Sequence, residues 1–296
     1  MSTNDYINRF LFDDTDIRGE IVAIEDTFQA AYQHQTFPKA LTPIFGDFLA
    51  GAALLAEVLK FEGTLTLQAR GQGNVALIMA ETNHEGHLRG ILRLQPDADS
   101  SAMSFDDISL PQLLGNGVLT ITIEPNKGKR YQGIIAITNN TLAECLQDYF
   151  SNSEQLPTQI QLYSDAGRCG GLFLQCLPKQ LVTDEEKRED LWQTAKQLAM
   201  TLSAKELFEL ENEQVLLRLF HEMQCRVFDA KPIVFRCSCS KERSGNALKS
   251  IGYDDAQALL QERDIISIDC EFCGKVYHFG EKDLDEIFER KNNLLH

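Results

Sequence analysis

"FRCSCSKERS" (residues 235–244) places Cys237 and Cys239 one residue apart, and "IDCEFCGK" (268–275) adds Cys270 and Cys273. A Cys-x-x-Cys turn that ends in glycine directs two sulfurs toward one point. A second pair from elsewhere in the chain completes a tetrahedral set of four sulfurs, for which zinc is the usual cytosolic metal. The spacing therefore predicts a small C-terminal zinc-binding domain, residues 233–296, with one Zn²⁺ held by these four thiolates.

Two other interpretations of the four cysteines stay open here: unrelated buried thiols, which behave as small apolar side chains, and an iron–sulfur cluster. His278 lies five residues after Cys273, but four thiolates already satisfy a metal, so we expect it to hydrogen-bond within a hairpin. The remaining cysteines lie outside the motif and are expected to be structural; they are Cys145, Cys169, Cys176 and Cys225.

A domain of this size rarely folds by apolar burial alone and needs a disulfide or a metal. The pattern predicts a helix near 246–250 that stops at Gly252, a second helix capped by Asp254 and Gln257, and a hairpin over 265–279 with the Cys-x-x-Cys pair at its turn. The expected core is thin and consists of Phe235, Ile251, Leu259, Leu260, Ile266, Ile268, Phe272, Tyr277, Phe279, Leu284 and Ile287.

The segment before this domain, residues 181–232, reads as an amphipathic helical linker. It opens with the charge run Asp184–Asp190 and repeats apolar residues at helical spacing. Because an isolated amphipathic helix is only marginally stable, the stripe should dock on the first domain. The stripe consists of Leu191, Leu198, Leu202, Leu207, Leu210, Leu216, Leu217 and Phe220, and Trp192 is expected to pack beside it.

Residues 1–180 are predicted to form a mixed α/β core domain. Helical periodicity covers 25–35 and 38–60, and strand-like segments follow at 64–70, 74–80, 87–95, 117–125 and 131–137. A helix near 141–153 and two more strands at 158–165 and 169–178 complete it. The strands follow one another without long helical crossovers, so we expect an α+β fold with a largely antiparallel sheet.

Composition narrows the function classes. The 296 residues carry a formal net charge of −16, which disfavours sequence-independent binding of nucleic acid. The N-terminal stretch lacks the features of a secretory signal, so a cytoplasmic location is expected. The most apolar stretch, 45–61, is interrupted by Asp47, Glu57 and Lys60, which indicates a buried helix and no membrane role.

Four thiolates on one divalent ion carry a net charge near minus two and are open to oxidants. Each pair is close enough in sequence to close its own disulfide, and metal-binding free energy in a small zinc domain is largely folding free energy. Oxidation would then unfold the domain. If that released the linker, an apolar stripe able to bind other proteins would be exposed.

Several motifs together resemble the bacterial redox-regulated 33 kDa heat-shock chaperone family. They are the two cysteine stretches above, "DIRGE" (16–20), "GNGVLTITI" (115–123), "RYQGII" (130–135) and "DYFSNSEQLPT" (148–158), in order along nearly the whole chain.

The resemblance implies an ATP-independent holdase, not an enzyme, that is inactive when reduced and zinc-bound. It further implies that oxidation during stress forms the disulfides Cys237–Cys239 and Cys270–Cys273, releases zinc and yields homodimers that bind unfolded client proteins.

Two other classes of function are weighed against it. A zinc ribbon that binds nucleic acid or another protein would need a basic, aromatic surface. A thiol-disulfide oxidoreductase using Cys270 and Cys273 would need the βαβ context of a redox Cys-x-x-Cys. The chain contains neither a P-loop nor a dinucleotide fingerprint, so turnover chemistry is not expected.

Overall fold

Two sheets form the framework of the first unit, Met1–Arg236, in a computed structural model that describes residues 5–98 and 109–288. One sheet has the strand order β10-β1-β2-β9-β8, with β11 also paired to β1, and the other has the order β12-β5-β4-β3-β6-β7. Among the described residues, every pair of strands is antiparallel except β12 with β5. The predicted α+β class with largely antiparallel strands is confirmed, with two sheets in this unit where one was expected.

The strands of the first sheet are β1 (Tyr6–Phe12), β2 (Ile17–Ile24), β8 (Thr158–Ser164), β9 (Cys169–Cys176), β10 (Cys225–Val227) and β11 (Lys231–Pro232). Those of the second are β3 (Gly63–Arg70), β4 (Val75–Asn83), β5 (His87–Leu94), β6 (Val118–Pro125), β7 (Tyr131–Ala136) and β12 (Val234–Phe235). The helices of the core are α1 (Asp26–Tyr32), η1 (Lys39–Leu41), α2 (Thr42–Val58), α3 (Leu110–Leu114), α4 (Leu142–Tyr149) and η2 (Phe150–Glu154). The β1–β2 hairpin was not predicted from the sequence.

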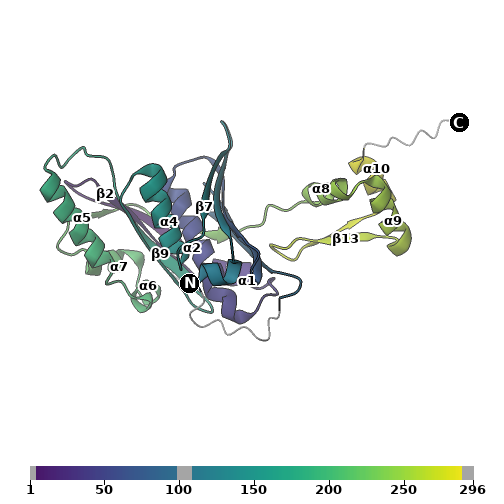
Figure 1. Ribbon diagram of the computed structural model, residues 1–296, viewed down its shortest axis with the longest axis horizontal. Helices are drawn as coiled ribbons and strands as arrows, with labels where there is room; N and C mark the ends of the chain where they lie inside the picture. Colours follow the sequence, from purple (N-terminus) through teal and green to yellow (C-terminus); the bar gives the residue numbers. More distant parts are fainter. Residues whose placement is uncertain (1–4, 99–108, 289–296) are drawn as a thin grey trace. The chain divides into compact units, whose positions relative to one another are not determined.

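Helix α2 lies between the two sheets and is buried almost all round (Figure 1). The segment Lys39–Val58 is long and apolar enough to cross a membrane by composition, yet 72% of its most apolar window is buried inside the protein. The prediction of a buried core helix is therefore confirmed. Asp47 of this helix is partly buried and accepts a hydrogen bond from Ser164 Oγ at 2.7 Å.

Three short helices cover the opposite face of the first sheet: α5 (Glu185–Ala199), α6 (Ala204–Glu209) and α7 (Asn212–Leu219) (Figure 1). They pack on Phe10, Phe12 and Ile21. Strand β9 is consequently buried along its whole length, which explains why all of its residues except Gln175 lack a charged or strongly polar side chain. The predicted docking of the apolar stripe on the first sheet is confirmed, and Trp192 packs within it. The prediction that Leu217 belongs to the stripe is wrong, because its side chain is 69% exposed.

The second unit, Cys237–His296, contains α8 (Lys241–Ile251), α9 (Tyr253–Arg263), the β13 (Ile266–Asp269) and β14 (Val276–Phe279) hairpin, and α10 (Glu281–Ile287). Its buried core among the described residues consists of Leu248, Ala256, Ile266, Tyr277, Phe279 and Leu284.

Three details of the sequence prediction for this unit are corrected. Helix α9 begins directly after Gly252, whose φ of +92° ends α8, so Asp254 lies inside the helix and caps nothing. Ile251 is 44% exposed. Phe235 belongs to the first unit, where β12 pairs it with Leu88.

Candidate metal centre

The β13–β14 turn presents Cys270 and Cys273. Cys270 N–H donates to Lys275 O at 2.9 Å, while Cys273 N–H and Gly274 N–H donate to Cys270 O at 3.2 and 2.7 Å. These bonds fold the chain tightly enough for both side chains to leave the turn on the same side. Gly274 has a φ of +66°, a conformation that glycine adopts without steric cost.

The other pair lies between β12 and α8. Ser240 caps α8 by accepting a hydrogen bond from Arg243 N–H. The Arg243 guanidinium in turn donates to Ser238 O at 3.1 Å and Ser238 Oγ at 2.7 Å. The residue between the two cysteines is thus fixed to the first turn of the helix, which holds Cys237 and Cys239 in place.

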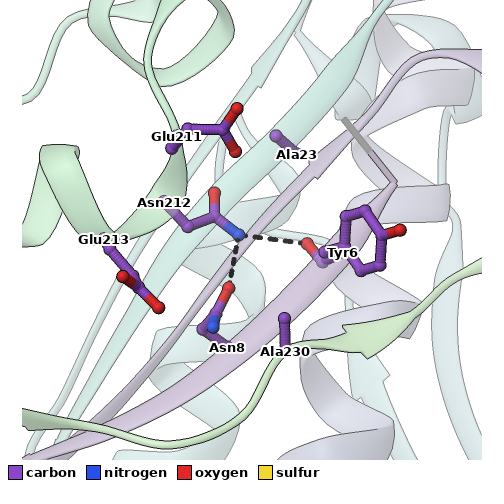
Figure 2. A pocket seen from close by; sticks show the side chains of 7 residues that line it. All are labelled: Tyr6, Asn8, Ala23, Glu211, Asn212, Glu213 and Ala230. Atoms are coloured by element: carbon purple, nitrogen blue, oxygen red, sulfur yellow. Dashed lines mark hydrogen bonds between the residues drawn. The ribbon is translucent and has the colours of Figure 1, made fainter. Parts of the chain in front are cut away.

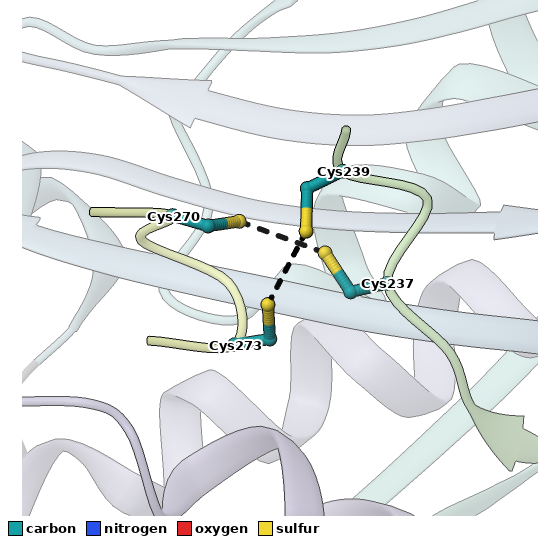
Figure 3. Close-up of side chains that lie close together, drawn as sticks. All are labelled: Cys237, Cys239, Cys270 and Cys273. Atoms are coloured by element: carbon teal, nitrogen blue, oxygen red, sulfur yellow. Dashed lines mark hydrogen bonds between the residues drawn. The ribbon is translucent and has the colours of Figure 1, made fainter. Parts of the chain in front are cut away.

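The four sulfurs converge on one point (Figure 3). All lie within 4.8 Å of one another, with Cys237–Cys270 at 3.6 Å and Cys239–Cys273 at 3.5 Å. In a tetrahedral zinc site with Zn–S bonds of about 2.3 Å, neighbouring sulfurs lie about 3.8 Å apart. All four cysteines are free thiols. The donor set and its spacing therefore fit a tetrahedral metal ion, and the four cysteines are close enough to hold one.

Hydrogen bonds distinguish the four thiols. Tyr277 Oη donates to Cys239 Sγ at 3.1 Å. Burial opposes ionisation of Cys239, but the bonds from Tyr277 and the other thiols outweigh it and lower the pKa of Cys239 to about 7. Burial, together with the neighbouring thiols, raises the pKa of Cys273 to about 12. A bound divalent cation would favour the thiolate form of every ligand.

The remaining cysteines lie in the first unit. Cys145, Cys169 and Cys176 are buried, and burial raises the pKa of each thiol. Burial also raises the pKa of Cys225, in β10, to about 11. Such thiols are poor nucleophiles at neutral pH. His278 shares a hydrogen bond of 2.9 Å with Ser267 across the hairpin, as predicted.

Comparison with known proteins places this geometry in a family. The model of the Hsp33 protein family matches residues 5–280, which include all four cysteines. The chain belongs to the Hsp33 family. Proteins named 33 kDa chaperonin from Pseudomonas paraeruginosa and Pseudomonas aeruginosa are each 45% identical over 289 residues, covering 97% of this chain and 96% of theirs. The 33 kDa chaperonin of Azotobacter vinelandii is 43% identical over the same shares.

A crystal structure of the 33 kDa chaperonin of Thermotoga maritima, a heat shock protein 33 homologue, shares the fold. Its TM-score is 0.78 at 22% identity, covering 96% of this chain and 98% of that one. The resemblance seen in the sequence motifs is confirmed, and Hsp33 membership supports a chaperone role.

Two side chains that shape the Hsp33 centre were missed from the sequence. Tyr277 was assigned to the core only, because alternation along β14 shows which face a residue occupies and not where its hydroxyl points. The contact of the Arg243 guanidinium with Ser238 follows no sequence pattern, although Ser240 as an N-cap residue could have indicated the helix start.

Proposed function

We propose that this protein is a redox-regulated, ATP-independent holdase chaperone. The observation that carries the proposal is the convergence of four free thiols in a unit whose own apolar core is small. Membership of the Hsp33 family supports the chaperone part, and the thiol cluster supports the redox part.

In the reduced state, Cys237, Cys239, Cys270 and Cys273 hold one Zn²⁺. The ion neutralises part of the thiolate charge and ties the β13–β14 turn to the residues before α8. Binding a structural zinc ion contributes roughly 10 kcal/mol or more of folding free energy to a small domain. The second unit therefore depends on its ligands for stability.

Oxidation removes the ligands in pairs. The thiolate pairs Cys237 with Cys239, and Cys270 with Cys273, each lose two electrons to form one disulfide, and Zn²⁺ is released. Peroxide or hypochlorite accepts the electrons together with protons from solvent and is reduced to water or to chloride and water. Sulfurs within 4.8 Å reach the bonding distance of about 2.05 Å by local movement of each short segment. Without its ligands the second unit unfolds.

Release of the linker helices α5–α7 connects oxidation of the thiols to client binding. Polar contacts hold them to the first sheet beside the apolar cluster, among them a hydrogen bond of 2.6 Å from Tyr163 Oη of β8 to Leu202 O, between α5 and α6. Asp16 accepts hydrogen bonds from the backbone amides of 180–182 and a bond of 2.9 Å from Arg188 of α5. At α7, Asn212 donates to Tyr6 O at 3.2 Å and Asn8 Oδ1 at 2.9 Å (Figure 2).

The covalent connection between these helices and the thiols is short. After α7 the chain is anchored by β10, β11 and β12, each only two or three residues long. A single residue, Arg236, separates β12 from Cys237. Unfolding that begins at Cys237 reaches α7 only after these short strands separate and the buried Ile233 side chain leaves the core.

Release of α5–α7 exposes the apolar faces of the helices and of the first sheet, a surface suited to unfolded client proteins. The same exposed faces favour association into a homodimer. The net charge of −16 helps keep the complexes soluble.

Light scattering of chemically denatured citrate synthase tests the proposal. Reduced, zinc-loaded protein should fail to suppress aggregation, whereas protein oxidised with peroxide at raised temperature should suppress it without ATP. Replacing both Cys270 and Cys273 by serine should abolish this dependence on oxidation, while Cys145→Ser, outside the cluster, should retain it. Equal protection by both redox states would refute the switch, and protection by neither would refute the chaperone function.

A further inference from the structure

A cavity of about 590 Å³ lies in the first unit. Its wall comes from β1, β2, the residues after α2 and the β10 segment. It is located beyond the end of α2, since Arg18 of the wall donates to Val58 O at the last residue of that helix, at 3.4 Å.

A buried acid without a partner faces this cavity. Glu20 is 1% exposed, and its Oε2 has no hydrogen-bond partner among the described residues. Burial raises the pKa of Glu20 to about 7, against the attraction of Arg18, Arg9 and Lys60. A buried carboxyl oxygen that lacks a donor destabilises the folded protein, so a donor that enters the cavity would recover that free energy.

Cations that line the same cavity also have unused donors. Arg18 uses one terminal nitrogen for Gln175 Oε1, at 2.8 Å, but its buried Nε has no partner among the described residues. Arg9 lies over the Phe228 ring at 5.4 Å, and neither it nor Lys60 forms an ion pair within the described part of the chain.

The other acids of the wall are largely occupied. Asp13 pairs with Arg226 at 2.8 Å, and Asp16 pairs with Arg188 at 2.9 Å. Asp14 is exposed to solvent. Three cations and one buried acid are therefore the charged groups left to meet a ligand.

This arrangement disfavours ligands that carry only positive or only negative charge. A simple anion would be placed beside the Glu20 carboxylate, and a simple cation would face three positive side chains. We propose that the cavity binds a small zwitterion of the α-amino-acid class, with its ammonium group on Glu20 and its carboxylate on Arg9, Arg18 Nε and Lys60. The volume is in the range of small-molecule sites, and Leu11 and Phe228 offer apolar contact to a side chain.

Calorimetric titration of the reduced, full-length protein tests the site. The probes are the twenty amino acids one by one, with acetate, methylamine and inorganic phosphate as single-sign controls. At least one amino acid should bind, and each control should bind at least about tenfold more weakly. Failure of every amino acid would mean that solvent alone satisfies Glu20, and tighter binding of acetate or phosphate would mean an anion site; either result overturns the proposal.

Variants locate the binding. Glu20→Gln and Arg9→Gln should each weaken the amino acid at least about tenfold. Arg130→Gln should change nothing, because Arg130 is exposed and pairs with Glu124 on the other sheet. Circular dichroism checks that each variant folds. If the buried Glu20→Gln variant does not fold, Arg9→Gln, at the rim of the cavity, still tests the site. Unaltered affinity in a folded Arg9 or Glu20 variant would overturn the assignment.

Discussion

Asp47 carries a carboxyl group in the second turn of the core helix α2, with Ser164 Oγ as its hydrogen-bond donor at 2.7 Å. Burial raises its pKa from 3.8 to about 6, and the Ser164 bond offsets only part of that effect. The folded protein therefore binds a proton more tightly than the unfolded chain, so stability should fall as pH rises from about 4 to 6.

Asp47→Asn should remove this loss because the amide oxygen still accepts from Ser164 and carries no charge. The difference between 3.8 and about 6 corresponds to roughly 3 kcal/mol, so the variant should be more stable than the parent at pH 8 by up to about that amount. Denaturant unfolding at pH 4.5 and 8 measures it. Burial also raises the pKa of Glu20, so its ionisation likewise lowers stability as pH rises, and the Asp47→Asn variant keeps that contribution. An exposed control, Asp97→Asn, should leave the pH profile unchanged.

At the scale of the element, the β13–β14 turn depends on one glycine. Gly274→Ala forces a side chain into a φ of +66°, at a cost of about 1–2 kcal/mol. The strain acts directly on the turn that presents Cys270 and Cys273, so zinc affinity should fall about tenfold in competition with a chelating dye. Gly280→Ala is the matched control, because its φ is −105° and an added Cβ would meet nothing within 4 Å. Equal affinity of both variants would show that the turn tolerates alanine.

The Asp16–Arg188 ion pair, which holds α5 on the first sheet, is a second contact that can be tested at this scale. Arg188 is 17% exposed and Asp16 4%, so Arg188→Met leaves a buried carboxylate with only backbone donors. Loss of one partner of a buried pair costs about 3 kcal/mol. Hydrogen exchange across 185–199 should accelerate while the sheet strands keep their protection. Lys179→Met breaks an exposed pair with Glu185 and should have little effect. Unchanged hydrogen exchange in the Arg188→Met variant would show that apolar packing alone holds α5 on the first sheet.

Local patterns predicted most elements, because periodicity and turn residues act over a few positions. The four-cysteine set was predictable for the same reason: each pair is local, and metal chemistry demands that the pairs meet. The Asp16–Arg188 pair joins residues 172 apart in the sequence, and the Asn8–Asn212 bond joins residues 204 apart. No local sequence pattern predicts contacts between residues this far apart. Leu217 was misplaced because helical spacing allows a wider stripe than the first sheet covers.

At the scale of the whole molecule, the two units differ in what stabilises them. The first unit has two apolar clusters around α2 and beneath α5–α7. The second has a core of a few side chains, and a core of that size supplies at most about 3–5 kcal/mol. A bound structural metal contributes roughly 10 kcal/mol or more, so the proposed zinc ion stabilises the second unit more than its apolar core does.

Removal of zinc from the reduced protein by a strong chelator should therefore unfold residues 237–288, because their core alone does not offset the entropy of folding. Amide protection in β13 and β14 should disappear, α5–α7 should follow, and α2 with its two sheets should remain protected in hydrogen exchange. A variant with serine at positions 237, 239, 270 and 273 should give the same pattern without chelator and should not respond to it. Persistent protection of β13 and β14 in that variant would mean that apolar packing, not the thiol cluster, folds the second unit, and a redox switch built on ligand loss would then have no structural basis.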